Sequence, residues 1–257
     1  MLNIKSKKVL NGIKLDKNYV FYKKNIIFSL YSFFLVGIFY VALFLPFKIL
    51  YPLRVINKMN FKKIKGKGAV LTFNHSVPLD GFMLASSIFP RSAYFPTLEI
   101  NFKGKILNFI FSSLKTVPLP KNLRLLPYFL LDMKKVVKDK KIVAVAPEGN
   151  LGKYRTYIDT FKKGAFKIAK EQNAPILPIA FWYIPRKFGK MKFVMIVGEP
   201  VFDTACYELD DLVSKIYDIT KKLIMDFNFE RALKGKKIIE LTEINKDGKE
   251  KIENCVG

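Results

Sequence analysis

The stretch GAVLTFNHSVPLDGFMLASSIF, residues 68–89, decides the expected fold. The apolar run AVLTF has the length of a buried strand, and a second apolar run after Asp80 has the length of a helix. Between the two runs lie the polar residues Asn74, His75 and Asp80, with Pro78 bending the chain. A strand that passes directly into a helix is typical of α/β proteins, in which ligands bind beyond the carboxyl ends of the strands.

The same alternation continues along the rest of the chain. Short apolar runs predict strands at residues 69–73, 93–95, 116–119, 142–146, 176–182 and 192–197. Longer amphipathic runs predict helices at residues 81–88, 103–114, 123–138 with a break or bend near Pro127, 160–172 and 209–227. We therefore predict an α/β fold with a mostly parallel central sheet flanked by helices.

An uncharged segment, IIFSLYSFFLVGIFYVALFLPF, occupies residues 26–47, which is about the length needed to span a bilayer as a helix. Lysine and arginine flank both ends in similar number, so the positive-inside rule gives no orientation. Two interpretations stay open: a single span, or a helix or helical hairpin returning through residues 48–56 that enters one leaflet. We expect an N-terminal membrane-anchoring segment at residues 1–67, an α/β domain at 68–233 and a charged, frayed tail at 234–257.

The formal net charge of +24 predicts an anionic partner. The lysines cluster on both sides of the apolar segment, which favours an anionic membrane surface at the cytoplasmic face of the cell membrane. Motifs of nucleic-acid-binding folds are absent from the sequence, so we expect no nucleic-acid partner. Cys206 and Cys255 form neither a disulfide framework nor a metal-ligand pattern, and we expect no metal and no cofactor.

His75, the only histidine, and Asp80 form a candidate catalytic pair. A carboxylate bonded to one ring nitrogen fixes the tautomer and leaves the other nitrogen free to accept a proton from an alcohol. The alternative is structural: Asp80 caps the helix, and His75 is a strand-end residue. Ser76 adjoins the histidine and is badly placed for a Ser-His-Asp triad.

A second polar loop, in IVAVAPEGNLGKYRT at residues 142–156, follows another predicted strand. Glu148 and Gly149 come directly after the strand, and basic residues follow, a combination that suits an anion held by cations and loop amides. The structural alternative is a simple turn followed by a solvated helix face. Because parallel strands end at one edge of the sheet, we expect both loops at that edge.

Five motifs in order resemble those of the glycerolipid acyltransferases, the family that includes lysophosphatidate acyltransferase. They are Asn74-His75 with Asp80, PEG at residues 147–149, FKKGA at 161–165, ILPIA at 176–180 and VGEP at 197–200. The resemblance covers roughly residues 68–202, and the family also carries an apolar N-terminal anchor.

The resemblance implies an activity. His75, oriented by Asp80, would deprotonate the free hydroxyl of a lysophospholipid, lysophosphatidate first among them, which then attacks the thioester of acyl-CoA or acyl-carrier protein. Glu148 and Gly149 would help to form the acceptor site, and the loop containing Pro178 would form part of the pocket wall.

The sequence departs from the family at the acceptor site. Relatives selective for lysophosphatidate usually read Phe-Pro-Glu-Gly-Thr-Arg, whereas this chain has Ala146, Asn150 and Leu151 in place of the Phe, Thr and Arg. The arginine that would grip a phosphate is therefore missing, and either another acceptor is used or other cations replace it. The candidates are Lys121, Arg124, Lys153 and Arg155.

Two further classes remain as alternatives. A basic membrane-surface protein without catalytic activity would need neither His75, Asp80 nor Glu148. A hydrolase would use the same pair of residues but let water attack in place of a lipid hydroxyl.

Overall fold

The computed structural model describes residues 15–44, 52–77, 79–185, 191–244 and 250–251. Seven strands form one sheet in the order β1-β7-β6-β2-β5-β3-β4. Their bounds are Leu53–Ile56 (β1), Ala69–Phe73 (β2), Ala93–Leu98 (β3), Thr116–Leu119 (β4), Ile142–Val145 (β5), Ile176–Pro185 (β6) and Met191–Val197 (β7). A separate two-stranded sheet is formed by β8 (Glu243–Ile244) and β9 (Glu250–Lys251).

The sheet is mostly parallel, as predicted. Strands β6, β2, β5, β3 and β4 all run in one direction, and only the β6–β7 pair is antiparallel. The central strand β2 is buried at every position, because its residues alternate between the hydrophobic clusters on the two faces of the sheet. The carboxyl ends of the five parallel strands therefore meet at one edge of the molecule.

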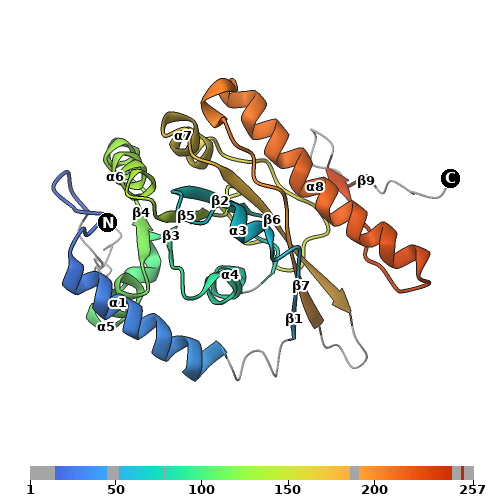
Figure 1. Ribbon diagram of the computed structural model, residues 1–257, viewed down its shortest axis with the longest axis horizontal. Helices are drawn as coiled ribbons and strands as arrows, with labels where there is room; N and C mark the ends of the chain where they lie inside the picture. The colour runs from blue at the N-terminus through green and yellow to red at the C-terminus, as the bar shows by residue number, and fades with distance from the viewer. Residues whose placement is uncertain (1–14, 45–51, 78, 186–190, 245–249, 252–257) are drawn as a thin grey trace, which may run out of the picture.

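Helices cover both faces of the sheet (Figure 1). The helices α6 (Leu126–Lys138), α7 (Gly164–Glu171) and α8 (Leu209–Leu233) contribute to the hydrophobic cluster on one face. The other face is packed by α4 (Asp80–Ile88) and by the short helix α3 (Asn60–Lys63). Short 3-10 helices occur at Glu99–Phe102 (η2), Leu123–Leu125 (η3) and Thr204–Cys206 (η5).

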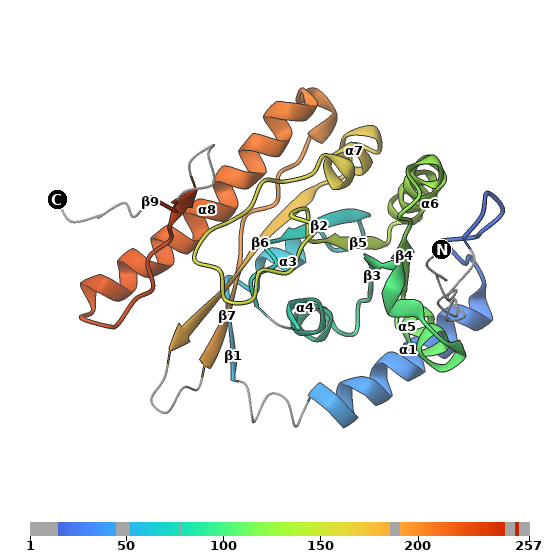
Figure 2. The same cartoon turned by 180° about the vertical axis from the view of Figure 1, so that it is seen from behind.

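The N-terminal apolar segment forms helix α1 (Ile26–Phe39), which continues as a π-helix, η1 (Tyr40–Phe44). It packs on α5 (Lys105–Ser113), where the buried Ser32 hydroxyl donates to the Ser113 carbonyl at 2.6 Å. Figure 2 shows α1 and α5 side by side at the end of the sheet near β4. Of the helices in the described ranges, none combines the length and apolar character that crossing a bilayer requires.

Two expectations for the ends of the chain are corrected. Residues 53–56, considered above as part of a returning hairpin, form strand β1 and pair in parallel with β7; residues 45–51 lie outside the described residues. The tail was expected to fray from residue 234, but its first part packs back onto the domain. Asn228 donates to the Ile239 carbonyl at 2.6 Å, and the Thr242 amide donates to the Thr156 carbonyl at 2.6 Å.

Candidate active site

The loop after β2 is held to strand β6 by Asn74. This fully buried side chain accepts a hydrogen bond from the Phe181 amide at 2.6 Å and donates to the Phe181 carbonyl at 2.9 Å. It also donates to the hydroxyl of Ser76, which is itself buried. Asn74 thus replaces the backbone pairing that ends with β2, and Ser76 is engaged in the fold and is not available as a nucleophile.

The structure brings His75 and Asp80 together. The Nδ1 atom of His75 lies 2.6 Å from Oδ2 of Asp80, and the other carboxylate oxygen accepts from the Gly81 amide at 2.6 Å. Asp80 is the first residue of α4 and is buried, whereas the His75 side chain is 29% exposed. The carboxylate therefore holds the Nδ1 side of the ring, which leaves Nε2 as the atom able to exchange a proton with a ligand. Pro78, expected to bend this loop, lies outside the described residues.

The electrostatics of the pair favour a charged imidazolium. Burial lowers the pKa of His75, but the hydrogen bond and charge of Asp80, together with the charge of Glu148, outweigh burial and leave this pKa above its ordinary value of 6.5. Burial raises the pKa of Asp80, and the bonds from His75 and the Gly81 amide offset part of that rise. A proton taken up at Nε2 is thus stabilised by the carboxylate behind the ring.

Glu148 lies behind His75. Its side chain is 1% exposed; one oxygen accepts from the His75 amide at 3.1 Å, and the other lies 3.5 Å from the guanidinium of Arg155. Burial raises the pKa of Glu148 to about 7, although the bond from His75 and the charge of Arg155 oppose the rise. Glu148 therefore fixes the backbone that carries the imidazole ring, through a contact between residues 73 positions apart.

The two strand-end loops are joined by further backbone bonds. The Gly152 amide donates to the His75 carbonyl at 2.9 Å, and the Tyr154 amide donates to the Ser76 carbonyl at 2.6 Å. Gly149 has a φ of +77°, and a Cβ atom there would lie 2.5 Å from Nζ of Lys162, so a side chain at this position would meet both backbone strain and that ammonium group. The loops after β2 and β5 thus form one unit at the carboxyl edge of the sheet.

The remaining candidates occupy different places. Arg155 is 17% exposed and is paired with Glu148 and with Asp159, the latter at 3.1 Å. Lys153 is exposed, with its ammonium 5.6 Å from the centre of the Tyr154 ring. Exposed residues Lys121 and Arg124 follow β4, three strands from β2 along the sheet.

Pro178 does not lie in a loop. It is buried inside strand β6, where it pairs in register with Thr72. Its carbonyl accepts a hydrogen bond from the amide of Gly198, the residue directly after β7, at 2.8 Å. The structure therefore places Pro178 in the sheet and not in a loop, and its predicted role in the pocket wall stays a prediction.

Sequence reasoning missed a set of exposed apolar side chains at this edge. Leu79, next to Asp80, is 57% exposed and adopts a left-handed conformation with φ of 63°. Others lie at the ends of parallel strands or just beyond them: Leu98, Ile100, Leu123 and Leu151. The sequence pattern does not distinguish these residues, because an isolated apolar residue in a sequence can equally be a buried core residue.

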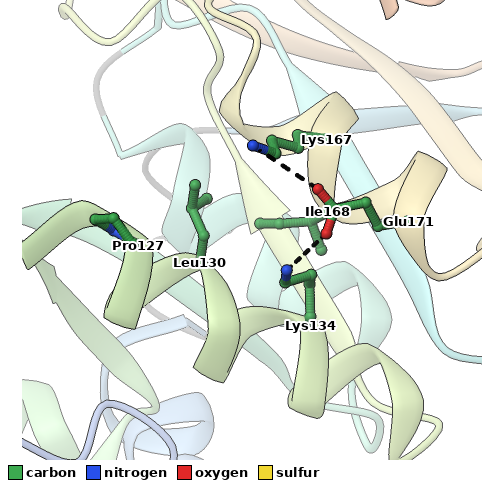
Figure 3. A pocket seen from close by; sticks show the side chains of 6 residues that line it. All are labelled: Pro127, Leu130, Lys134, Lys167, Ile168 and Glu171. Carbon is green, nitrogen blue, oxygen red and sulfur yellow. Dashed lines mark hydrogen bonds and ion pairs between the residues drawn. The ribbon is translucent and has the colours of Figure 1, made fainter.

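A small cavity between α6 and α7 is separate from this site (Figure 3). It has a volume of about 120 Å³, and Glu171 is part of its lining. The carboxylate oxygens of Glu171 lie 2.6 Å from Nζ of Lys134 and 3.9 Å from Nζ of Lys167. Lys134 belongs to α6, and Lys167 and Glu171 belong to α7, so the pair between Lys134 and Glu171 links the two helices.

The site places an imidazole bonded to a carboxylate at the carboxyl edge of the sheet, and comparison with family models identifies the family. Residues 52–182, just over half of the chain, match the Acyltransferase family, and the chain belongs to that family. Among solved structures, the chain is similar to the 1-acyl-sn-glycerophosphate (LPA) acyltransferase PlsC from Thermotoga maritima. The TM-score is 0.57 at 18% identity, covering 79% of this chain and 95% of the other, a likeness of fold. Among curated proteins no match is found.

Proposed function

We propose that this acyltransferase transfers a fatty acyl group from acyl-CoA or acyl-carrier protein to the free hydroxyl of a lysophospholipid, with lysophosphatidate as the first candidate. The observation that carries the proposal is the 2.6 Å contact between Nδ1 of His75 and Asp80 at a partly exposed ring. That geometry suits a general base, because Nε2 faces away from the carboxylate that orients it.

The proposed reaction needs no covalent enzyme intermediate. Nε2 of His75 accepts the hydroxyl proton as the acceptor oxygen attacks the thioester carbonyl, giving a tetrahedral intermediate. The carbon–sulfur bond then breaks, and the imidazolium returns its proton to the leaving thiolate. The products are the ester and the free thiol of the carrier, and Asp80 stays ionised throughout.

For the anionic group of the acceptor, Lys153 is a better candidate than Arg155. Arg155 is already paired with two carboxylates, so a phosphate would have to compete with Glu148 and Asp159. Lys153 is exposed and lies in the loop bonded to His75; within the described residues its ammonium group makes no ion pair or hydrogen bond and lies near the Tyr154 ring. Lys121 and Arg124 remain candidates for a longer anionic group, such as the phosphates of the carrier.

We also propose that the enzyme works at the cytoplasmic face of the cell membrane. Helix α1 exposes apolar side chains at a spacing of four residues, with Ile26, Leu30, Phe34 and Ile38 between 57% and 77% exposed. On the adjacent helix α5, Ile106 and Phe109 are exposed as well. A surface of this kind is typical of membrane contact. The exposed leucines at the sheet edge would then receive the acyl chain from the bilayer.

The test is turnover by the purified full-length chain in vesicles, with labelled acyl-CoA or acyl-carrier protein and a panel of lysolipids. We expect a new phospholipid, and a loss of roughly 10²- to 10⁴-fold in His75→Ala. His75→Asn, whose side-chain amide can still donate to Asp80 but cannot act as a base, should be equally inactive with an unchanged melting temperature.

The products distinguish the alternatives. Release of free fatty acid without phospholipid would identify a hydrolase, and vesicle binding without any turnover would identify a non-catalytic membrane protein. Full activity in His75→Ala would overturn the proposed mechanism.

A further inference from the structure

A second hollow lies at the opposite edge of the sheet from His75. Its volume is about 340 Å³, and its lining is Tyr22, Lys24, Lys138, Asp139, Lys140 and Lys141. Lys141 directly precedes β5, so the hollow lies at the amino ends of the parallel strands. The proposed reaction uses none of these residues.

The lining carries four lysines against a single carboxylate. Asp139 is already committed, because it lies 3.1 Å from Nζ of Lys24 and accepts from the Tyr22 hydroxyl at 2.8 Å. Lys138 and Lys140 are exposed and make no ion pair within the described ranges. The hollow therefore has an excess of positive charge that the protein itself does not balance.

One further lysine, Lys115, lies behind the hollow and shares the Tyr94 ring with the lining residue Lys141. The ammonium groups of Lys141 and Lys115 lie 6.0 Å and 5.7 Å from the centre of the buried Tyr94 ring. Burial and the charge of Lys141 lower the pKa of Lys115 to about 8. The buried Tyr94 hydroxyl has no hydrogen-bond partner in the described part of the chain, and its ring packs edge-to-face on Tyr22. An anion in the hollow would relieve this concentration of positive charge.

Helix capping alone does not account for the cluster. Lysines near the end of α6 interact favourably with its dipole, which explains Lys138. However, Lys24 comes from the N-terminal segment, and Lys115 and Lys141 precede separate strands. Three parts of the chain thus bring cations to one place.

The position beside α1 identifies the anion. Lys24 precedes the first residue of α1 by two positions, and Val20, Ile26 and Ile27 next to it are between 55% and 77% exposed. A free phosphate would need no apolar surface beside its site, whereas the headgroup of a lipid in the bilayer would. We propose that this hollow binds the phosphate headgroup of an anionic phospholipid, as a site separate from the active site; the inference rests on the proposed membrane association of α1.

The experiment measures binding of the full chain to vesicles of phosphatidylcholine alone and to vesicles in which phosphatidylglycerol replaces part of it. The pocket variant is Lys138→Gln/Lys140→Gln, two exposed changes that leave the core intact. The matched control is Lys103→Gln/Lys105→Gln, which removes the same charge from exposed positions at the start of α5, beside the apolar surface but outside the hollow. A third measurement titrates inorganic phosphate into each protein without vesicles.

We expect the wild type and the control to prefer anionic vesicles, and the pocket variant to lose roughly 10- to 30-fold of that affinity. All three proteins should bind neutral vesicles equally, through α1. Equal losses in both double variants would overturn the site in favour of diffuse attraction. If phosphate binds the wild type and not the pocket variant while both keep their vesicle preference, the ligand is free phosphate and the lipid assignment is wrong. Failure of every protein to bind neutral vesicles would refute the membrane association of α1, separately from the hollow.

Discussion

His75 is fixed at three atoms. Asp80 holds Nδ1, Glu148 accepts from its amide, and the Gly152 amide donates to its carbonyl. The ring therefore has little freedom to move relative to the sheet, and the position of Nε2 is fixed. Such support is what a general base requires, because a misplacement of about 1 Å can cost about 10²-fold in rate.

The pH dependence of catalysis should reflect the effect of Asp80 on the pKa of His75. His75 must be neutral to accept a proton, and Asp80 raises its pKa, so kcat/KM should rise with pH through a midpoint above 6.5. In Asp80→Asn the negative charge is gone, so the midpoint should move down and kcat should fall on the order of 10²- to 10⁴-fold. The measurement is kcat/KM against pH for both proteins. An unchanged midpoint in the variant would mean that Asp80 does not act on His75.

The free energy of unfolding should depend on pH through the ionisation of Glu148. Its folded pKa of about 7 exceeds its ordinary 4.5, so the folded state holds this proton more tightly than the unfolded state. Stability is therefore lost as pH rises from 4.5 to 7, by about 3 kcal/mol from this group. Glu148→Gln removes that loss, so its stability relative to wild type should increase across this window.

Denaturant titrations at several pH values measure the effect. Glu148→Gln keeps an oxygen for the His75 amide, and Glu148→Ala does not. We therefore expect most of the activity to survive in the Gln variant and to be lost in the Ala variant. A relative stability that does not change with pH would contradict the buried, proton-holding state.

At the level of elements, the close approach of β2 and α6 depends on Gly68. A Cβ atom at this position would lie 1.9 Å from the Val137 carbonyl oxygen, which belongs to the backbone of α6. Gly68→Ala should therefore destabilise the fold by about 1–3 kcal/mol, the usual cost of overpacking. The control is Gly164→Ala at the start of α7, where a Cβ atom meets nothing within 4 Å. Thermal melting of both variants would decide, and equal melting temperatures would refute the contact.

The strands that consist of a short, mainly apolar run could be predicted from the sequence. Residues 69–73 and 116–119 were predicted with the bounds that β2 and β4 have. The break expected near Pro127 corresponds to the change from η3 to α6, since this proline occupies the first turn of the helix. The predicted helix at 160–172 begins later, at Gly164, because the residues before it belong to the loop bonded to Pro147.

Contacts between residues far apart in the sequence could not be predicted. Nothing local marks residues 53–56 as a strand, because their partner β7 is more than a hundred positions away. Likewise, the five-residue spacing of His75 and Asp80 indicated a contact, whereas the bond from Glu148 to the His75 amide depends on how β2 and β5 pair. Local chemistry can be inferred from spacing, but the support around it requires the sheet order.

For the whole molecule, the apolar surface of α1 predicts vesicle binding. Phe34 is 66% exposed, so Phe34→Glu should weaken binding to neutral vesicles by roughly 10-fold or more, because a carboxylate would replace an inserted ring. Phe229 is 65% exposed and belongs to α8, a helix that lies apart from α1 on the other side of the sheet in Figures 1 and 2. Phe229→Glu is the matched control and should bind as the wild type does. Flotation assays measure both, and equal losses would exclude α1 as the contact.

Strand β1 also decides how the chain can be shortened. It occupies one end of the sheet and covers the apolar strand MKFVMIV at residues 191–197. A protein that started at Gly68 would leave the amides and carbonyls on the β1 side of that strand unpaired, while its pairing with β6 would remain. Such an exposed edge can pair with the same strand of another copy and lead to aggregation. One that started at Pro52 would keep the edge covered, and is the better choice for preparing a catalytic domain freed of α1.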